Sequence, residues 1–251
     1  MESDCDIKET IREGWSDPGR VEGWVESGLC REFNDPAGRK AWLGALGEAA
    51  NGMGVRSSLD VGTGPGTLAL LWAELGFPST GLDFSPAMLE AGRNAAEQRQ
   101  LAVDFVAGDA ESPPFPEGSF DVVSSRFVLF TLPHPGWAIR CWLRLLRPNG
   151  ILVLVGHDHP TDPKRSKHHS KANPKWQATE RHREALRHLP FANHTSGELR
   201  VVMEASGLEN IHFIPNQEII AARAALSARD PDSGPYESTP FVLVGRKIQA
   251  S

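Results

Sequence analysis

Three glycines at alternate positions follow an acidic residue in residues 58–67, which read Ser-Leu-Asp-Val-Gly-Thr-Gly-Pro-Gly-Thr. Glycine accepts a positive φ and has no Cβ, so a turn rich in glycine lets the backbone approach a bound nucleoside closely. The apolar residues before the turn predict a strand, and Leu68, Leu71 and Leu75 at i, i+3 and i+7 predict a helix after it. This succession indicates a nucleotide pocket, and a tight turn without a ligand is the alternative interpretation.

Two further carboxylates follow predicted strands. Asp83 ends a short strand predicted from residue 79, and Asp109 follows a strand predicted at 103–106. Ligands of an open parallel sheet bind outside the carboxyl ends of its strands, so we expect Asp60, Asp83 and Asp109 to converge on one crevice. Asp83, about 20 residues beyond the glycine turn, is placed to hold ribose hydroxyls.

The glycine spacing bears on which nucleotide is bound. The dinucleotide fingerprint G-x-G-x-x-G seats a pyrophosphate on a helix N-terminus. Here the glycines are Gly62, Gly64 and Gly66, and Asp60 stands two residues before the first of them. A carboxylate at that place repels phosphate and attracts a cation. The pattern therefore favours a ligand that carries an ammonium and a sulfonium.

With these features the chain resembles the class I S-adenosylmethionine-dependent methyltransferases, over about residues 57–156. The segments that carry the resemblance are 59–66 (Leu-Asp-Val-Gly-Thr-Gly-Pro-Gly), 81–89 (Gly-Leu-Asp-Phe-Ser-Pro-Ala-Met-Leu), 108–110 (Gly-Asp-Ala), 120–123 (Phe-Asp-Val-Val) and 145–154 (Leu-Leu-Arg-Pro-Asn-Gly-Ile-Leu-Val-Leu). Five motifs in this order and spacing are far more specific than any one of them.

The resemblance implies S-adenosylmethionine (SAM) as cofactor and S-adenosylhomocysteine as product. It implies a glycine loop under the methionine part, Asp83 on the ribose hydroxyls, Phe84 and Met88 flanking the adenine, and Asp109 accepting from the adenine amino group. The segment after the fourth strand would lie nearest the methyl group. The cofactor-binding residues implied are Asp60, Gly62, Thr63, Gly64, Gly66, Asp83, Phe84, Met88, Gly108, Asp109, Ala110, Ser125 and Arg126.

The pattern of elements predicts the fold that positions these residues. Alternating strands and helices from 57 to 156 predict an α/β, Rossmann-like doubly wound sheet that is mostly parallel. A helix at about 135–147 should end at Pro148-Asn149-Gly150, before a buried strand at 151–155. The final strand, at 241–244, should run antiparallel to its neighbours, as in the family.

Two segments flank this core in the predicted domain organisation. Residues 1–56 form a helical N-terminal cap, and residues 57–251 form the SAM-binding domain with a lid insertion at 157–195. In the cap, Trp42 should pack on the sheet, whereas Trp15 and Trp24 either pack likewise or cover the cofactor cleft next to the substrate.

Methyl transfer is an in-line displacement at an activated carbon, so the protein mainly supplies alignment, a dry pocket and, in many cases, a base. Just past the fifth strand, His157 and His159 are candidate bases, or alternatively they hydrogen-bond within the loop. Phe127 stands where relatives often carry histidine, so it favours an aromatic or apolar substrate or a base from elsewhere. His168, in the insertion, is a further candidate substrate contact.

Composition limits the remaining functions. The net charge of −6 argues against a general binder of nucleic acid or anionic membranes, because both rely on excess Lys and Arg. No apolar run reaches bilayer length, and the first 30 residues lack a signal-peptide core, so we expect a soluble, cytoplasmic protein. The three cysteines are too few and scattered for a disulfide framework or a metal site.

The histidine-rich insertion leaves two alternatives open. Its histidines match no standard zinc pattern, so we expect no metal. A metal site is the alternative, because several histidines lie in a short span. The basic run at 164–171 is either a solvated loop or an anion-binding segment. The leading hypothesis is a methyltransferase acting on O, N or S of a small-molecule metabolite. The alternatives are an RNA or protein methyltransferase, or a SAM-binding protein without methyl transfer; the oligomeric state is not predicted.

Overall fold

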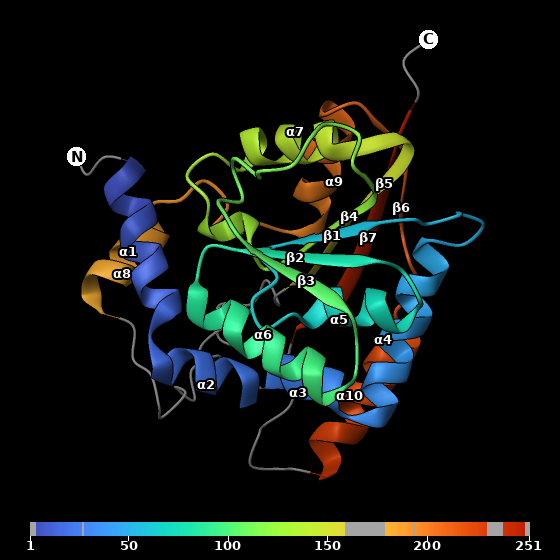
Figure 1. The fold of residues 1–251 in the computed structure, drawn as a ribbon, viewed down its shortest axis with the longest axis horizontal. Coiled ribbons are helices and arrows are strands. Elements are labelled where there is room, and N and C mark those ends of the chain that lie inside the picture. The colour runs from blue at the N-terminus through green and yellow to red at the C-terminus, as the bar shows by residue number, and fades with distance from the viewer. Residues whose placement is uncertain (1–3, 27, 159–178, 193, 230–237, 249–251) are drawn as a thin grey trace.

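The computed structural model describes residues 4–26, 28–158, 179–192, 194–229 and 238–248. In this part of the chain a seven-stranded sheet has the order β3-β2-β1-β4-β5-β7-β6 and lies between layers of helices (Figure 1). The strands are β1 Ser58–Val61, β2 Ser79–Asp83, β3 Val103–Ala107, β4 Phe120–Arg126, β5 Leu146–Asp158, β6 Leu208–Phe213 and β7 Thr239–Lys247.

The strand directions confirm the predicted fold class. β1 pairs in parallel with β2 and with β4, β2 with β3, and β4 with β5. β7 lies antiparallel between β5 and β6, as predicted for the last strand. The chain therefore has a Rossmann-like doubly wound sheet, whose carboxyl edge at β1, β2 and β3 gathers the acidic residues.

Helices precede and connect these strands; in the described part of the predicted cap, α1 to α4 end at Ala49, and 50–56 are not helical. α8 falls within the predicted insertion, whereas residues 159–178 lie outside the description. The helices are α1 Asp4–Ser16, α2 Pro18–Glu26, α3 Gly28–Asn34, α4 Pro36–Ala49, α5 Thr67–Glu74, α6 Pro86–Gln98, the 3-10 turn η1 Leu129–Thr131, α7 Pro135–Leu145, α8 Glu180–Arg187, α9 Ser196–Ala205 and α10 Gln217–Arg229.

A separate apolar core lies on each face of the sheet. On one face α4, α5 and α10 contribute Trp42, Trp72 and Ile219, which confirms that Trp42 packs on the sheet. On the other face α7 and α9 contribute Trp142 and Met203. The indole of each of these three tryptophans is fully buried. Burial on both faces fixes the strands and hence the loops at their carboxyl ends.

The predicted end of the helix before β5 was wrong by two residues. α7 ends at Leu145, and β5 begins at Leu146 instead of Ile151. Lys247 Nζ donates to the carbonyl oxygens of Leu143 and Leu146, which satisfies acceptors that a longer helix would have used. Asn149 adopts a left-handed φ of 64° where the register with β4 shifts. The segment Pro148-Asn149-Gly150, which was predicted to end the helix, therefore lies at an irregularity inside β5.

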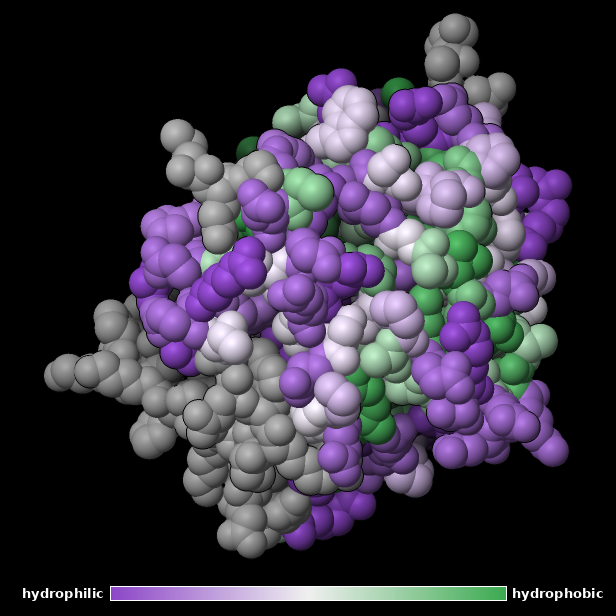
Figure 2. Space-filling view, turned by 60° about the vertical axis from the view of Figure 1, so that its left-hand side comes forward, coloured by the Kyte–Doolittle hydropathy of each residue, from purple (hydrophilic) through white to green (hydrophobic). Residues whose placement is uncertain are grey.

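Helix α1 crosses the carboxyl end of the sheet and has two different faces. It buries Thr10 and Ile11, whereas the paired side chains of Glu9 and Arg12 are half exposed and lie at the cavity described below. α8 packs beside it (Figure 1). The view that brings this side of the molecule forward shows a mostly hydrophilic surface (Figure 2). None of the described helices is long and apolar enough to cross a membrane.

Candidate active site

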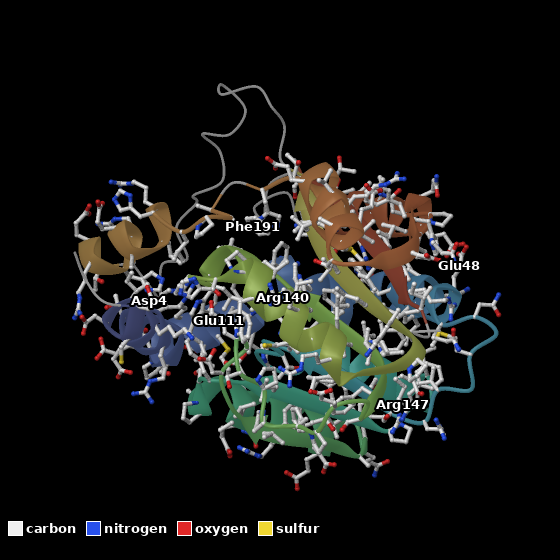
Figure 3. All side chains as sticks on the ribbon, turned by 90° about the horizontal axis from the view of Figure 1, so that it is seen from above. Asp4, Glu48, Glu111, Arg140, Arg147 and Phe191 are labelled. Atoms are coloured by element: carbon white, nitrogen blue, oxygen red, sulfur yellow. The ribbon has the colours of Figure 1, made fainter. Side chains whose placement is uncertain are left out.

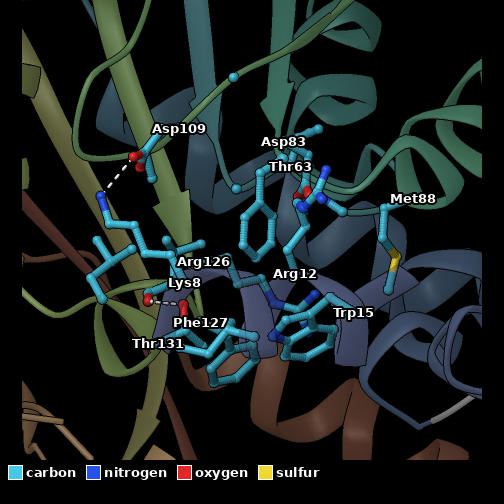
Figure 4. Close-up of a pocket in the computed structure, with 18 of the residues that line it drawn as sticks. Lys8, Arg12, Trp15, Thr63, Asp83, Met88, Asp109, Arg126, Phe127 and Thr131 are labelled. Atoms are coloured by element: carbon cyan, nitrogen blue, oxygen red, sulfur yellow. Dashed lines mark hydrogen bonds and ion pairs between the residues drawn. The ribbon is translucent and has the colours of Figure 1, made fainter. Parts of the chain in front are cut away.

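A cavity of about 300 Å³ opens where the carboxyl ends of the strands meet α1 and α2 (Figure 4). It unites residues that the sequence assigned separately to cofactor and substrate. Gly66, Ser125 and His157 do not line it, while His159 and His168 lie outside the described residues. The sequence-predicted residues that line it are Trp15, Trp24, Asp60, Gly62, Thr63, Gly64, Asp83, Phe84, Met88, Gly108, Asp109, Ala110, Arg126 and Phe127.

The glycine loop joins β1 to α5 in a conformation that side chains rarely adopt. Gly62, Gly64 and Gly66 have φ values of 66°, 54° and 82°. A Cβ on Gly62 would overlap the side chain of Val128, and one on Gly66 would lie 2.9 Å from Cζ of Phe105. Gly66 thus serves packing against β3, whereas Gly62 and Gly64 present bare backbone to the cavity.

Asp60, at the end of β1, is a buried carboxylate beside the cavity. Its Oδ1 accepts from Ser124 Oγ at 3.0 Å, and Trp72 Nε1 donates to the same hydroxyl at 3.1 Å. Burial raises the pKa of Asp60 to about 7, although hydrogen bonds to the carboxylate oppose the shift. A cation bound in the cavity would favour the ionised form, so this position suits an ammonium.

Asp83, at the end of β2, ties the glycine loop to the next helix. Its Oδ2 accepts from the Gly64 N–H at 2.8 Å, and its Oδ1 accepts from the Ser85 N–H at 2.9 Å. Ser85 caps α6 by accepting from the Met88 N–H, and its hydroxyl donates to the carbonyl oxygen of Trp15 at 3.0 Å. Burial raises the pKa of Asp83 to about 6, although the hydrogen bonds from backbone N–H groups act in the opposite direction. The backbone thus fixes this carboxylate's orientation.

Lys8 of α1 reaches over the cavity edge to a pair of carboxylates. Its Nζ lies 2.6 Å from Asp109 Oδ2 (Figure 4) and 2.6 Å from Glu111 Oε2. Glu111 also accepts from the His134 N–H at the start of α7, so it lies between α1 and α7 (Figure 3). Burial lowers the pKa of Lys8, but the two carboxylates outweigh it and raise the pKa overall. Sequence reasoning missed this contact.

Three aromatic rings form one wall of the cavity. Trp15 and Trp24 meet edge to face with 5.0 Å between centroids, and Trp24 meets Phe127 likewise at 6.5 Å. Phe127 has a left-handed φ of 58°, a costly conformation for an aromatic residue. Of the two interpretations of Trp15 and Trp24, the structure places both rings at the cavity.

A buried charged cluster lies next to this wall. Arg126 Nη2 is 3.6 Å from Oε1 of Glu32 in α3, and Arg223 Nη2 of α10 is 2.9 Å from the same oxygen. Arg223 also bonds to Nε2 of His157, whose ring lies against Phe127. His157 therefore stands in this cluster and not on the cavity lining, a placement that does not favour its predicted role as a base. Glu32 and Arg223 lie 191 residues apart, and no local pattern indicated either.

The described residues contain no cluster of side chains that could bind a metal ion. No group of three or more His, Cys, Asp or Glu side chains there is arranged to hold an ion. His157 is the only histidine of the cluster His157, His159, His168 and His169 that the structure describes. The hypothesis of a histidine-rich metal site therefore stays outside the described part of the chain.

The doubly wound sheet, the glycine loop after β1 and the acidic ends of the next strands define a class I SAM-dependent methyltransferase fold. The comparisons agree: the methyltransferase domain family matches residues 59–154. This segment of the chain is therefore a methyltransferase domain of that class.

Individual relatives share this domain over part of their length. A demethylmenaquinone methyltransferase of Renibacterium salmoninarum is 35% identical over 122 residues, which cover 49% of this chain and 50% of the relative. The ubiquinone/menaquinone biosynthesis C-methyltransferase UbiE of Pseudomonas putida is 38% identical over 122 residues, covering 45% and 48%. The match thus spans about half the length of these curated relatives.

Among solved structures, phosphoethanolamine N-methyltransferase 2 of Haemonchus contortus in complex with SAM superposes with a TM-score of 0.68. The superposition covers 99% of this chain and 61% of that chain, at 16% sequence identity. At this identity the likeness shows the shared fold alone.

Proposed function

We propose that the protein transfers a methyl group from SAM to a small-molecule acceptor, releasing S-adenosylhomocysteine. One observation carries this proposal: the same cavity is lined by the glycine loop with Asp83 and Asp109, and by the aromatic wall of Trp15, Trp24 and Phe127. Cofactor and acceptor can therefore meet in one space of about 300 Å³.

The polar end of the cavity suits the cofactor. Asp60 would receive the ammonium of the methionine part, and the bare backbone of the glycine loop would pass beneath it. Asp83 would hold the ribose hydroxyls, with Phe84 and Met88 beside the adenine. Asp109 would accept from the adenine amino group, sharing its carboxylate with Lys8. Each of these residues lines the cavity, which supports this orientation.

The aromatic end suits the acceptor. Methyl transfer needs the acceptor atom in line with the sulfonium bond, and a dry pocket that holds a flat molecule supplies that alignment. Trp24 meets both Trp15 and Phe127 edge to face, and the parts of these rings that line the cavity can contact a planar or apolar metabolite. Phe127 and the two tryptophans are therefore proposed as substrate contacts. His168 and the base His159 stay proposals on the insertion.

The names of the relatives suggest a class of acceptor. Two of them are named as methyltransferases of demethylmenaquinone and of ubiquinone or menaquinone biosynthesis, the second as a C-methyltransferase. An acceptor with a quinone-like ring would fit the aromatic wall. Carbon is therefore a candidate acceptor atom in addition to O, N and S. Because the match covers only half of each relative, we propose the ring type and not the particular molecule.

The other functions receive less support. A net charge of −6 disfavours RNA as substrate, since phosphate binding needs excess positive charge. A SAM-binding protein without methyl transfer would retain the polar end of the cavity but form no S-adenosylhomocysteine with any acceptor. We propose a cytoplasmic enzyme on the strength of the composition.

The test is turnover with methyl-labelled SAM against a panel of quinols, phenols, amines and thiols. S-adenosylhomocysteine should form only in the presence of one acceptor class, in proportion to labelled product. Tight SAM binding with no product from any acceptor would favour the non-transferring alternative. Absence of SAM binding would overturn the assignment of the cavity.

A further inference from the structure

One buried imidazole joins three helices that are separated in the sequence. His182 of α8 is 2% exposed. Its Nε2 lies 2.7 Å from Nη1 of Arg20 in α2, and its Nδ1 lies 3.4 Å from the carbonyl oxygen of Thr10 in α1. A Cβ on Gly14 would overlap the ring, so α1 carries glycine where the imidazole approaches it. The insertion helix is therefore fitted closely to the N-terminal helices.

The guanidinium that His182 contacts is stacked on the cavity wall. Cζ of Arg20 lies 3.5 Å from the centroid of the Trp15 ring, and Arg20 is 8% exposed. Trp15 lines the cavity and meets Trp24 edge to face. A continuous series of contacts thus leads from His182 through Arg20 to Trp15, and so from the insertion to the ligand space.

The protonation states of the pair agree with this series. Burial, together with the positive charge of Arg20, lowers the pKa of His182, so the imidazole is neutral at neutral pH. Burial lowers the pKa of Arg20 to about 9, which still leaves the guanidinium charged. A neutral imidazole can accept from Arg20 at Nε2 and carry its hydrogen on Nδ1, facing the Thr10 carbonyl. Both ring nitrogens then have a suitable partner.

We propose that His182 is a positioning residue for the cavity: it holds the Arg20 guanidinium against the Trp15 ring and thereby fixes Trp15. The Trp15 ring belongs to the aromatic wall, and its carbonyl oxygen accepts from Ser85 next to Asp83, at the end of the cavity assigned to the cofactor. The cation stacked on the indole face restricts the ring to one orientation, and the imidazole restricts the cation. Through α8 the insertion thus influences ligand affinity. This inference rests on the proposed function in taking S-adenosylhomocysteine as the ligand.

The first experiment measures S-adenosylhomocysteine affinity by calorimetry. His182→Ala should weaken binding about tenfold, which corresponds to about 1.4 kcal/mol. His182→Gln should restore affinity to within about threefold of the wild type, because its amide oxygen accepts from Arg20 and its amide N–H faces Thr10. His188→Ala is the matched control: this histidine, just after α8, is exposed and bonds to Glu184 of the same helix. It should leave affinity unchanged.

The second experiment asks whether His182 acts through Trp15. In a Trp15→Ala background, His182→Ala should have no further effect on affinity, whereas additive losses would overturn the inference. Thermal melts set a temperature at which every variant is folded. If His182→Ala does not fold, Arg20→Lys replaces it, because a lysine keeps the charge but loses the planar stack. Unchanged affinity in Arg20→Lys would overturn the inference.

The two proposals fail differently. A wild-type protein that does not bind S-adenosylhomocysteine would contradict the proposed function. If the wild type binds S-adenosylhomocysteine and the folded His182→Ala variant binds it equally tightly, only the positioning role is contradicted.

Discussion

The imidazole of His157 lies edge-on against the ring of Phe127, with 4.8 Å between centroids and 76° between the ring planes. Phe127 lines the cavity, and His157 bonds to Arg223 beside it. The histidine just past β5, which by its position in the sequence could be a base, thus supports the aromatic wall.

His157→Gln should therefore keep SAM-dependent turnover within about threefold of the wild type. A general base contributes on the order of a hundredfold or more, so its removal would be unmistakable in kcat. A loss of about a hundredfold at unchanged S-adenosylhomocysteine affinity would restore the catalytic role of His157.

Glu32→Gln should destabilise the fold strongly. The Glu32 carboxylate is 1% exposed and serves the guanidinium groups of Arg126 and Arg223, so its neutralisation leaves buried positive charge uncompensated. We expect a loss of about 3 kcal/mol or more in the free energy of unfolding, measured by urea denaturation. The exposed Glu117, paired with Arg144 on the surface, is the control: Glu117→Gln should cost less than about 1 kcal/mol. Equal losses would contradict the importance of the buried cluster.

Gly62→Ala and Gly76→Ala separate backbone strain from loss of the binding loop. Both glycines have a positive φ, 66° and 84°, but only a Cβ at position 62 meets another side chain, that of Val128. Both variants should lose about 1 kcal/mol of stability from the strain alone. Only Gly62→Ala should also weaken S-adenosylhomocysteine binding by about tenfold or more. Equal affinities in calorimetry would mean that the loop does not carry the cofactor.

Asp60 should give the protein an unusual dependence on pH. Its pKa is about 7 in the folded protein against 3.8 for an ordinary aspartate, so the folded state holds an extra proton between about pH 4 and 7. The stability from this group is present below pH 4 and is lost as the pH rises through 7. Asp60→Asn should remove that loss, so its stability relative to the wild type should rise between pH 5 and pH 7.5. A relative stability that stays constant across this range would refute the shift.

Cofactor affinity should change in the opposite sense. An ammonium placed near Asp60 binds the ionised carboxylate better, so SAM affinity of the wild type should increase from pH 5.5 to 7.5. Asp83, with a pKa of about 6, contributes to the lower part of this range. The increase between pH 6.5 and 7.5 should be absent in Asp60→Asn, measured by calorimetry at each pH.

The sequence predicted those parts of the fold and site that local patterns encode. The glycine loop, the acidic strand ends and the cap on α6 each depend on a few neighbouring residues, and the structure places Asp60, Asp83 and Asp109 at one cavity, as expected. The end of α7 was misplaced because Asn149 signals a turn equally well inside a bulged strand.

Contacts between distant segments escaped prediction. Lys8 meets Asp109 across 101 residues, and His182 meets Arg20 across 162. Lys8 is one of many charged residues in a helix whose outer face is solvated, and nothing in its neighbourhood singles it out. The pairing of Lys8 with Asp109 depends on the packing of α1 over the strand ends, which the sequence does not reveal. The tryptophans of the cap were a partial signal, because large aromatic side chains early in the chain need a surface to cover.

The central claim, that this cavity binds SAM through the acidic strand ends, is tested most directly by calorimetric titration of S-adenosylhomocysteine into the wild type, Asp83→Ala and Asp104→Ala. Asp104 is an exposed carboxylate of β3 that does not line the cavity. We predict one-to-one binding to the wild type and to Asp104→Ala, and a loss of about 1–3 kcal/mol in Asp83→Ala through a missing charged acceptor. An Asp83→Ala variant that binds as tightly as the wild type would contradict the claim.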